Sequence, residues 1–480
     1  MATEYKIYPP IGFARVGSST SEFIIARERL GLAESQIDAA GVETPVAGYK
    51  SGPLDIKPVA ARFRVFAIPD DGTSPCVVDA AIGASVEWTV EVANRKNGVN
   101  RGGSPPASSA VPVDSPSGAA SRILPGAKTI SGVSTGPVNL DGGTFEGVPV
   151  SLGELRTDGN QNLLVVGAKG VSASPANTPI GNFYRNDGWH DDSCDGVIRA
   201  RVTLQNGDVV SDVAPAWVVS GPPDYAPDIE GLVTLYDIMR EVARQNFSLP
   251  LGTVSFTNDI YPIIRRANQL QWVNSNFLWS VISTNWPALA DSSSAATALR
   301  QTTRNQIVAA AGSLSSFQLT TLQNEILQNF ATGTFTSDWV GVPISTGLAP
   351  DELTRVALDS TVGQGFFPGI EAGRITQNPS IYSHPFEFRL DTTVVKPGDL
   401  TALMAVPWQA DFLACSGGWW PSQRPNDVLT AGGAGPDDWS RGVNSFRDMV
   451  NKFNRLGFVV PQMDGSGNSI FVEQERDPGL

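Results

Sequence analysis

The segment from Val406 to Arg441 concentrates side chains that can support redox and acid–base chemistry. It contains a single thiol, Cys415, and several acids, of which Asp411 lies four positions before that thiol. It also contains four of the chain's 11 tryptophans: Trp408, Trp419, Trp420 and Trp439. The residue types alone favour a plainer interpretation, an aromatic wedge of the core around a buried, inert cysteine. Composition and spacing therefore mark this segment without deciding what it does.

Other patterns along the chain do not complete a known catalytic or metal-binding motif. Asp191, Ser193 and Asp195 resemble the start of a calcium loop, but the twelfth position, which requires a carboxylate, is Val202. The two histidines of the chain leave little room for a multi-histidine metal site. The glycine patterns lack the strand–turn–helix context of a serine hydrolase or a dinucleotide-binding enzyme. We therefore expect no metal, no NAD and no tightly bound flavin in this chain.

Length and charge exclude several classes of partner. The chain has 480 residues, enough for two or three domains, and a net charge of −14. No cluster of Lys and Arg offers the basic face that nucleic acid requires, so we expect neither nucleic acid nor an anionic membrane as a partner.

No run of about 18 apolar residues could span a membrane, and the first ten residues lack the basic and apolar regions of a secretory signal. Three cysteines are too few for a disulfide scaffold. These features predict a soluble, cytoplasmic protein.

The first half of the chain has the pattern of strands. From about residue 5 to 225, short β-rich runs are separated by Gly, Pro, Asn and Asp. The clearest runs are Arg62–Phe66, Val86–Val92, Leu163–Val166, Val197–Leu204 and Ala216–Val219. Residues 97–145 differ because Gly, Ser and Pro dominate them. We predict a long surface excursion without regular structure there, with ordering over a partner or an active-site mouth as the alternative.

The second half has the pattern of helices. Apolar residues recur at helical spacing in Asp228–Arg244, Thr257–Trp272, Ala295–Phe330 (as two helices broken near Gly312) and about Arg441–Leu456, with Gly457 as a C-cap. Residues 335–440 have little periodicity, and so much irregular chain usually marks a functional region. We therefore predict an α+β fold of two parts. A β-rich N-terminal region, residues 1–225, packs on a mostly α-helical C-terminal region, residues 226–480, which carries the functional segment in irregular chain.

Seven stretches resemble one family in the order in which that family has them. Besides the segment 406–441, they are Ile7–Val16, Val86–Lys96, Asn186–Gly196, Pro215–Pro227, Phe256–Arg265 and Gly365–Gly373. They resemble the amino acid oxidases that build a cysteine tryptophylquinone (CTQ) cofactor, a group that includes L-lysine 6-oxidase and glycine oxidase. The likeness covers nearly the whole chain, and seven matches in order are specific where any one alone would be weak.

The resemblance implies a cofactor made from the chain's own residues. In this family a tryptophan is oxidised to a quinone and joined to a cysteine sulfur; Cys415 and Trp439 match that pair. Asp411 matches the acid that assists the cross-link. Trp419 and Trp420 resemble a packing landmark, with modification of one of them as the alternative. The implied reaction is oxidative deamination of a primary amine, an amino acid or a peptide amino group, to a carbonyl product, ammonia and hydrogen peroxide.

The resemblance also implies substrate positions. His190 stands where the family tends to place an aromatic residue near the substrate; the alternative is a surface histidine between two solvated acids. Thr361 lies near another expected pocket position. The alternative is that Thr361 is a turn residue without a role in substrate binding. His384 is a third candidate for substrate binding, although a histidine before a proline is more often structural.

Partners and location follow from the same resemblance. The family completes its quinone with a separate flavoprotein, so we expect a flavoprotein maturation partner, O2 as oxidant and a homo-oligomer. Members of the family can leave the cell without an ordinary signal peptide, so export is an alternative to a cytoplasmic location.

One departure from the family concerns spacing. Only 23 residues separate Cys415 from Trp439, fewer than the family leads us to expect. The missing segment weakens any transfer of substrate identity. It also leaves two alternatives: a non-catalytic relative that binds a peptide or small molecule, and an oxygen-dependent enzyme that modifies a peptide or protein on the same scaffold.

Overall fold

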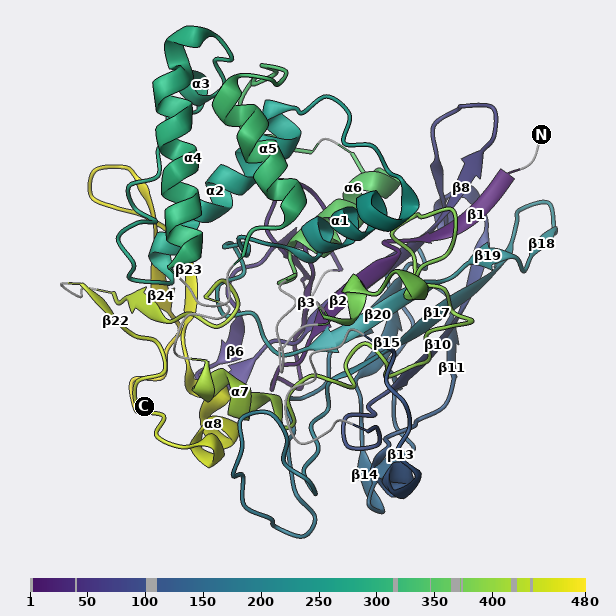
Figure 1. The fold of residues 1–480 in the computed structure, drawn as a ribbon. Coiled ribbons are helices and arrows are strands. Elements are labelled where there is room, and N and C mark those ends of the chain that lie inside the picture. The colour runs from purple at the N-terminus through teal and green to yellow at the C-terminus, as the bar shows by residue number, and fades with distance from the viewer. Residues whose placement is uncertain are drawn as a thin grey trace.

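The computed structural model of this protein consists of a large sheet and a group of helices (Figure 1). The structure describes residues 3–38, 41–100, 110–313, 318–345, 347–363, 372, 374–415, 421–431 and 435–480. No helix within these ranges is long and apolar enough to cross a membrane.

Sixteen strands of the described residues join in one mixed sheet. Its main path, in spatial order, is β11 (Lys128–Ser131), β10 (Ser85–Ala93), β17 (Cys194–Thr203), β20 (Ala216–Gly221), β2 (Ile11–Arg15), β8 (Val59–Pro69), β16 (Leu163–Val166), β15 (Glu154–Thr157) and β12 (Val138–Asn139). The other strands of the sheet are β1 (Thr3–Tyr8), β3 (Ile24–Ile25), β4 (Ser35–Ile37), β5 (Glu43–Pro45), β9 (Cys76–Val78), β18 (Val209–Val210) and β19 (Val213–Ala214). Two short hairpins in the first half of the chain lie outside it, β6 (Lys50–Gly52) with β7 (Asp55–Ile56), and β13 (Gly143–Phe145) with β14 (Val148–Val150).

The predicted strands all belong to this sheet. β10 illustrates why a local sequence pattern was enough to predict them. Val86, Trp88, Val90 and Val92 alternate with more exposed residues and are buried, as a period of two requires. β10 pairs antiparallel with β17 along its whole length, with Ala93 opposite Asp195. The residues that follow β10 therefore lie beside those that precede β17.

The prediction for residues 97–145 is wrong in the described part of that stretch. It contains β11, β12, β13 and a 3-10 helix at Pro116–Ser121, and Ile123 and Leu140 are fully buried. β11 pairs with β10 at the edge of the sheet. These strands have two to four residues, too few to show a period of two, so only their distant partners define them. Residues 101–109 lie outside the described ranges.

Most helices lie in the second half of the chain. They are α1 (Leu235–Phe247), α2 (Tyr261–Gln269), α3 (Trp286–Leu289), α4 (Thr297–Gly312), α5 (Thr321–Thr332), α6 (Pro350–Asp359), α7 (Trp408–Ala414) and α8 (Phe446–Lys452). α2 to α5 gather on one side of the molecule, away from α7 and α8 (Figure 1). The predicted break near Gly312 is confirmed, because α4 ends there and a capping box of Thr320 and Gln323 starts α5. α1 begins later than predicted, since Thr234 caps it with Asp237.

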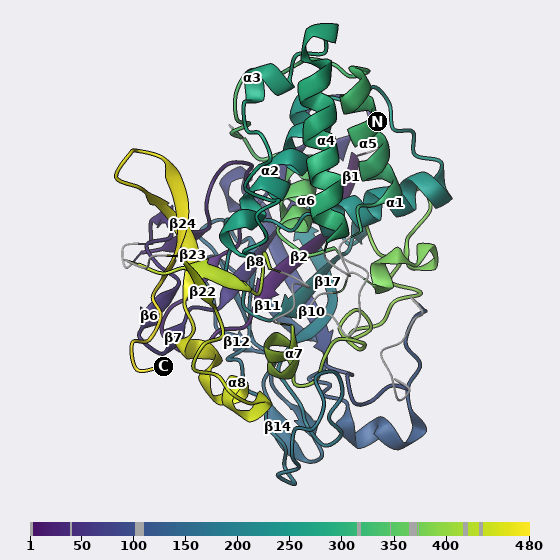
Figure 2. The same cartoon turned by 60° about the vertical axis from the view of Figure 1, so that its left-hand side comes forward.

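The C-terminal prediction needs correction. The helix predicted over 441–456 begins only at Phe446, where the Ser445 side chain caps it, and ends at Lys452 before a 3-10 turn. Gly457 is no C-cap; it precedes a hairpin of β23 (Phe458–Met463) and β24 (Ser469–Gln474) that the helical prediction missed. A smaller hairpin joins β21 (Asp427–Leu429) to β22 (Pro436–Asp438). Figure 2 shows β22, β23 and β24 side by side.

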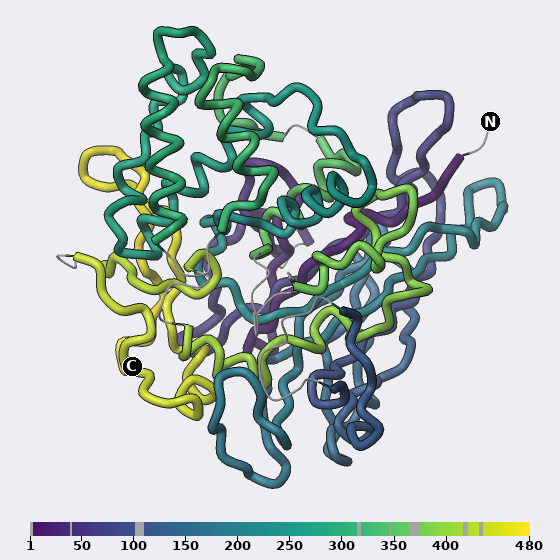
Figure 3. The backbone as a smooth tube through the Cα atoms, in the orientation of Figure 1, coloured from purple at the N-terminus to yellow at the C-terminus, as the bar shows by residue number. Residues whose placement is uncertain are grey.

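One hydrophobic core joins the two halves of the chain. It contains Val16 and Ile56 from the strand-rich part together with Trp408, Cys415 and Trp439 from the other part. The ends of the chain lie on opposite sides of the molecule (Figure 3). The α+β prediction, a β-rich N-terminal region packed on a mostly helical remainder, is confirmed. The prediction that the segment 406–441 lies in irregular chain is wrong for α7, β21 and β22, which fall within it; its residues Trp408, Cys415 and Trp439 lie where the two parts meet.

Candidate active site

Asp411 of α7 and Cys415, which caps the C-terminal end of that helix, lie on one side of it. The Cys415 backbone N–H donates to the Asp411 carbonyl at 2.9 Å, so the two residues are one helical turn apart. At that spacing side chains lie above one another, and the Cys415 thiol donates a hydrogen bond to Asp411 Oδ1 at 3.0 Å. Asp411 has no exposed surface and Cys415 only 4%. The spacing of four noted in the sequence is therefore a direct contact in the core.

Trp439 enters the same core from the end of β22. Its indole is fully buried and donates from Nε1 to the Gly457 carbonyl at 2.9 Å. Its ring centroid lies 4.7 Å from that of Tyr225 at an interplanar angle of 61°. Tyr225 is itself fixed, because its hydroxyl donates to the Phe453 carbonyl at 2.6 Å. The indole therefore has one defined orientation.

Arg424 connects the thiol and the indole. Its guanidinium carbon lies 5.0 Å from the Trp439 ring centroid, and its charge acts on the Cys415 thiol and the Asp411 carboxyl. Arg424 is almost fully buried, and its Nε donates to the Phe412 carbonyl at 2.6 Å. Among the described residues it has no carboxylate partner, and Nη2 has no hydrogen-bond partner. Burial lowers its pKa to about 10.

A buried cation with no carboxylate partner among the described residues is costly, so Arg424 becomes a further candidate residue of the site. Sequence reasoning missed Arg424. The only signal was that two arginines, Arg424 and Arg441, lie within the tryptophan-rich segment, and the contact of Arg424 with the indole depends on the fold.

The acid–base state of the site follows from burial. Burial raises the pKa of Asp411 to about 7, against the opposing effects of the Cys415 hydrogen bond and the charges of Lys96 and Arg424. Burial, and next the negative charge of Asp411, raise the pKa of the Cys415 thiol well above its ordinary value. Asp411 Oδ2 has no hydrogen-bond partner among the described residues. Near neutral pH the thiol is protonated, and Asp411 is able to take up or release a proton.

His190 is buried, so the alternative of a surface histidine between solvated acids is wrong. Asp191 and Asp192, which flank it, are buried as well. Its ring lies 5.1 Å from that of Phe145, Nδ1 has no partner within the described part of the chain, and burial lowers its pKa. The connection to the site runs through the next residue, since Asp191 Oδ2 accepts from the Trp408 backbone N–H at the start of α7.

Thr361 and His384 lie in different places. Thr361 is buried just after α6, where its carbonyl accepts from Leu235 N–H and its hydroxyl donates to the Ala357 carbonyl. The next residue, Val362, belongs to the same core as Cys415. His384 is exposed and stacks on Phe247, 5.8 Å away, beside a different hydrophobic cluster. The structure brings Asp411, Cys415 and Trp439 into one core and leaves His384 outside it. Trp419, Trp420 and most of Gly365–Gly373 lie outside the described residues.

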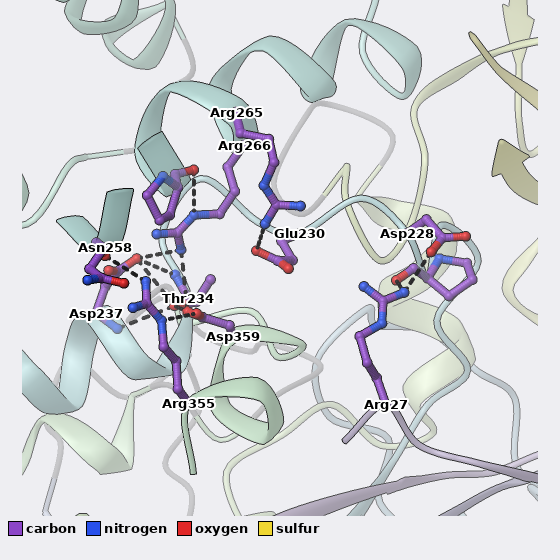
Figure 4. A network of polar contacts seen from close by, with 12 residues as sticks. Arg27, Asp228, Glu230, Thr234, Asp237, Asn258, Arg265, Arg266, Arg355 and Asp359 are labelled. Atoms are coloured by element: carbon purple, nitrogen blue, oxygen red, sulfur yellow. Dashed lines mark hydrogen bonds and ion pairs between the residues drawn. The ribbon is translucent and has the colours of Figure 1, made fainter. Parts of the chain in front are cut away.

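A second polar cluster, next to Thr361, has a structural role (Figure 4). Arg266 pairs with Asp237 at 2.8 Å, and Arg355 pairs with Asp359 at 3.2 Å. Asp359 also accepts from the Thr234 hydroxyl at 2.7 Å. Because these charges neutralise one another, the cluster ties α1, α2 and α6 together. The described residues contain no group of three His, Cys, Asp or Glu side chains placed to hold a metal ion.

Comparisons with known proteins identify relatives of this chain. A family model described as the L-lysine epsilon oxidase N-terminal region matches residues 8–220, and one described as the L-lysine epsilon oxidase C-terminal domain matches residues 308–431. L-lysine 6-oxidase from Marinomonas mediterranea is 25% identical over 99% of this chain and 90% of that protein.

Solved structures show the same fold. The crystal structure of the L-Lys epsilon-oxidase from Marinomonas mediterranea has a TM-score of 0.79 at 22% identity. The crystal structure of the Schiff base intermediate of that enzyme with L-Lys has a TM-score of 0.80 at 23% identity. Each alignment covers 98% of this chain and 95% of the other. Fold and sequence thus define a protein built like these oxidases, and the chain belongs to the L-lysine ε-oxidase family, as the sequence resemblance predicted.

Proposed function

We propose that this protein is an amino acid oxidase whose cofactor is a cysteine tryptophylquinone formed from Cys415 and Trp439. The observation that carries the proposal is the buried thiol of Cys415, hydrogen-bonded to Asp411 in the core that also holds Trp439. Kinship with an enzyme named L-lysine 6-oxidase supports the reaction class. The substrate is a primary amine, either an amino acid or an amino group of a peptide.

The residues present fit the formation of this cofactor. Joining the Cys415 sulfur to the indole requires that the thiol lose its proton, and Asp411 is the acceptor in contact with it. Asp411 then holds that proton because its pKa is about 7. Oxidation of the indole needs an outside oxidant, and we propose that a separate flavoprotein supplies this step.

The proposed reaction converts a primary amine, O2 and water to a carbonyl compound, ammonia and hydrogen peroxide. A tryptophylquinone supplies the electrophilic carbonyl that the amine attacks and accepts two electrons, which O2 removes. Asp411 is the general base that takes the proton from the substrate carbon. Arg424 holds a positive charge against the Trp439 ring, where electron density rises during the reaction. Their burial keeps bulk water away from both groups.

Peptide mass spectrometry of the matured protein tests the proposal. Trypsin leaves Cys415 and Trp439 on one peptide because Arg424 precedes a proline. We expect this peptide to carry two extra oxygens, to have lost hydrogens, and to give no backbone fragments between the two residues. Cys415→Ser should abolish the modification. Cys194→Ser, a change at another buried thiol, should leave it intact.

An unmodified peptide from protein matured with its flavoprotein would refute the CTQ proposal. Peroxide and ammonia release on adding amines then separates an oxidase from a non-catalytic binding protein. Oxygen consumption with a modified peptide and no ammonia would indicate the peptide-modifying alternative.

A further inference from the structure

Two stretches that the proposed chemistry does not use meet at one end of the sheet. Asn94, Arg95 and Lys96 follow the last residue of β10, and Asp191 to Ser193 precede the first residue of β17. Because Ala93 pairs with Asp195, the antiparallel ladder brings the two stretches together. Lys96 and Asp191 are fully buried there and form an ion pair of 2.8 Å between Nζ and Oδ2.

This ion pair holds the chain where α7 begins. Lys96 Nζ also donates to the Ala405 carbonyl at 2.8 Å. Asp191 Oδ2 also accepts from the Trp408 backbone N–H at 3.1 Å. That N–H belongs to the first residue of α7 and has no partner within its own helix. The other carboxylate oxygen, Asp191 Oδ1, accepts from Asn94 Nδ2 at 3.1 Å and from the Ser193 hydroxyl at 2.7 Å.

Neighbouring contacts fix the segment leading into α7. Asp195 Oδ1 accepts from the Thr401 backbone N–H at 2.8 Å. The Val406 carbonyl accepts from Asn186 Nδ2 at 3.0 Å. Arg95 pairs with Asp399. The sheet end thus holds residues 399–408, and one helical turn beyond Trp408 lie Asp411 and then Cys415.

We infer that Lys96 and Asp191 are positioning residues: their buried ion pair fixes the start of α7 and thereby the place where Asp411 and Cys415 meet Trp439. This inference rests on the proposed function. Replacing a buried pair by apolar residues is often neutral for stability, so stability alone does not account for this pair. The contacts assign that purpose, since both members bind backbone at the entry to the helix that carries the thiol and the base.

Lys96 has a second effect on the site. The groups whose charge or hydrogen bond acts on Asp411 are Cys415 on its own helix, Lys96 beyond β10, and Arg424. The positive charge of Lys96 opposes the rise in the Asp411 pKa that burial causes. Loss of that charge therefore moves the pKa of Asp411 further upward, an effect that a purely structural role would not produce.

The test compares Lys96→Met and Lys96→Arg with wild type, each matured with the flavoprotein. For Lys96→Met we expect a smaller cross-linked fraction by mass spectrometry, and in the cross-linked molecules a kcat lowered about 10- to 100-fold with little change in KM. The acidic limb of the kcat–pH profile should move to higher pH. Lys96→Arg keeps the charge and should leave that limb in place. The matched control is Lys57→Met, at another buried lysine whose partner is Glu22, and it should change none of these readouts.

The double variant Lys96→Met/Asp191→Asn guards against misfolding, because it leaves no unpaired buried charge. It should show the same shift of the acidic limb. A wild-type cross-linked fraction and an unmoved limb in both Lys96→Met and the double variant would overturn the inference. Absence of the cross-link in wild type itself would instead overturn the proposed function.

Discussion

Replacing Asp411 by asparagine should lower kcat strongly while stabilising the fold at alkaline pH. Asparagine keeps the size of the side chain but cannot accept the proton of the Cys415 thiol or of the substrate. Loss of a general base lowers kcat by about 10²- to 10⁴-fold. In matured wild type, burial still raises the pKa of Asp411, and the cross-linked sulfur no longer donates the hydrogen bond that lowers it, so kcat should rise with pH along an acidic limb. That acidic limb should be absent from Asp411→Asn.

The burial of Asp411 also sets the size of the pH-dependent change in the free energy of unfolding. The folded-state pKa is raised from 3.8 to about 7, so the contribution of Asp411 is fully present below about pH 4 and is lost as pH rises through 7. A shift of roughly 3 units corresponds to about 4 kcal/mol at alkaline pH. The neutral amide of the variant would carry no such penalty. The free energy of unfolding of Asp411→Asn, relative to wild type, should therefore increase between pH 4 and pH 8 by up to about 4 kcal/mol.

The assay is urea unfolding at several pH values, on both proteins made without the maturation partner, beside kcat–pH profiles of the matured forms. Asp192 is the matched control because burial raises its pKa to about 7 as well. Asp192→Asn should show the gain in stability with the acidic limb retained. An acidic limb that persists in Asp411→Asn, or a stability difference independent of pH, would refute the reasoning.

Three further substitutions test other contacts of the site and the fold. Arg424→Gln removes the charge beside the indole, so kcat should fall about 10²- to 10³-fold and the acidic limb should move to higher pH, as pH profiles would show. Tyr225→Phe leaves the Phe453 carbonyl without its donor and should cost about 1–3 kcal/mol in urea unfolding. Arg266→Met leaves Asp237 buried without its partner and should cost about 3–5 kcal/mol, with the mass of the cross-linked peptide unchanged in the folded fraction.

Local signals in the sequence were sufficient for much of the fold. The alternation in β10 and the Thr320–Gln323 capping box depend on residues a few positions apart, and both elements were predicted. Asp411 and Cys415 lie in a stretch predicted to be irregular, so only the structure shows that their four-residue spacing is one turn at α7. The hairpin of β23 and β24 also has a local signal, the turn Asp464–Gly467 between β-rich runs, although no strand is predicted there above.

Non-local contacts account for what the sequence left undecided. β11 and β12 are too short to show a period and exist through their partners β10 and β15. The acids beside His190 suggested that this stretch is exposed to solvent. The pairing of β10 with β17 instead brings the stretch beside the residues that follow β10, where Asp191 is buried and pairs with Lys96.

The sequence by itself determined much of the strand and helix pattern, because local periodicity carries it, and the resemblance of seven stretches to one family supplied the family and the candidates Cys415, Asp411 and Trp439. Only the tertiary structure decided that Arg424 faces the indole and that Lys96 holds the start of α7. It also decided that Asp411 titrates near neutral pH. The physical reason is that burial and the meeting of distant segments set desolvation and charge proximity, and no local pattern encodes either.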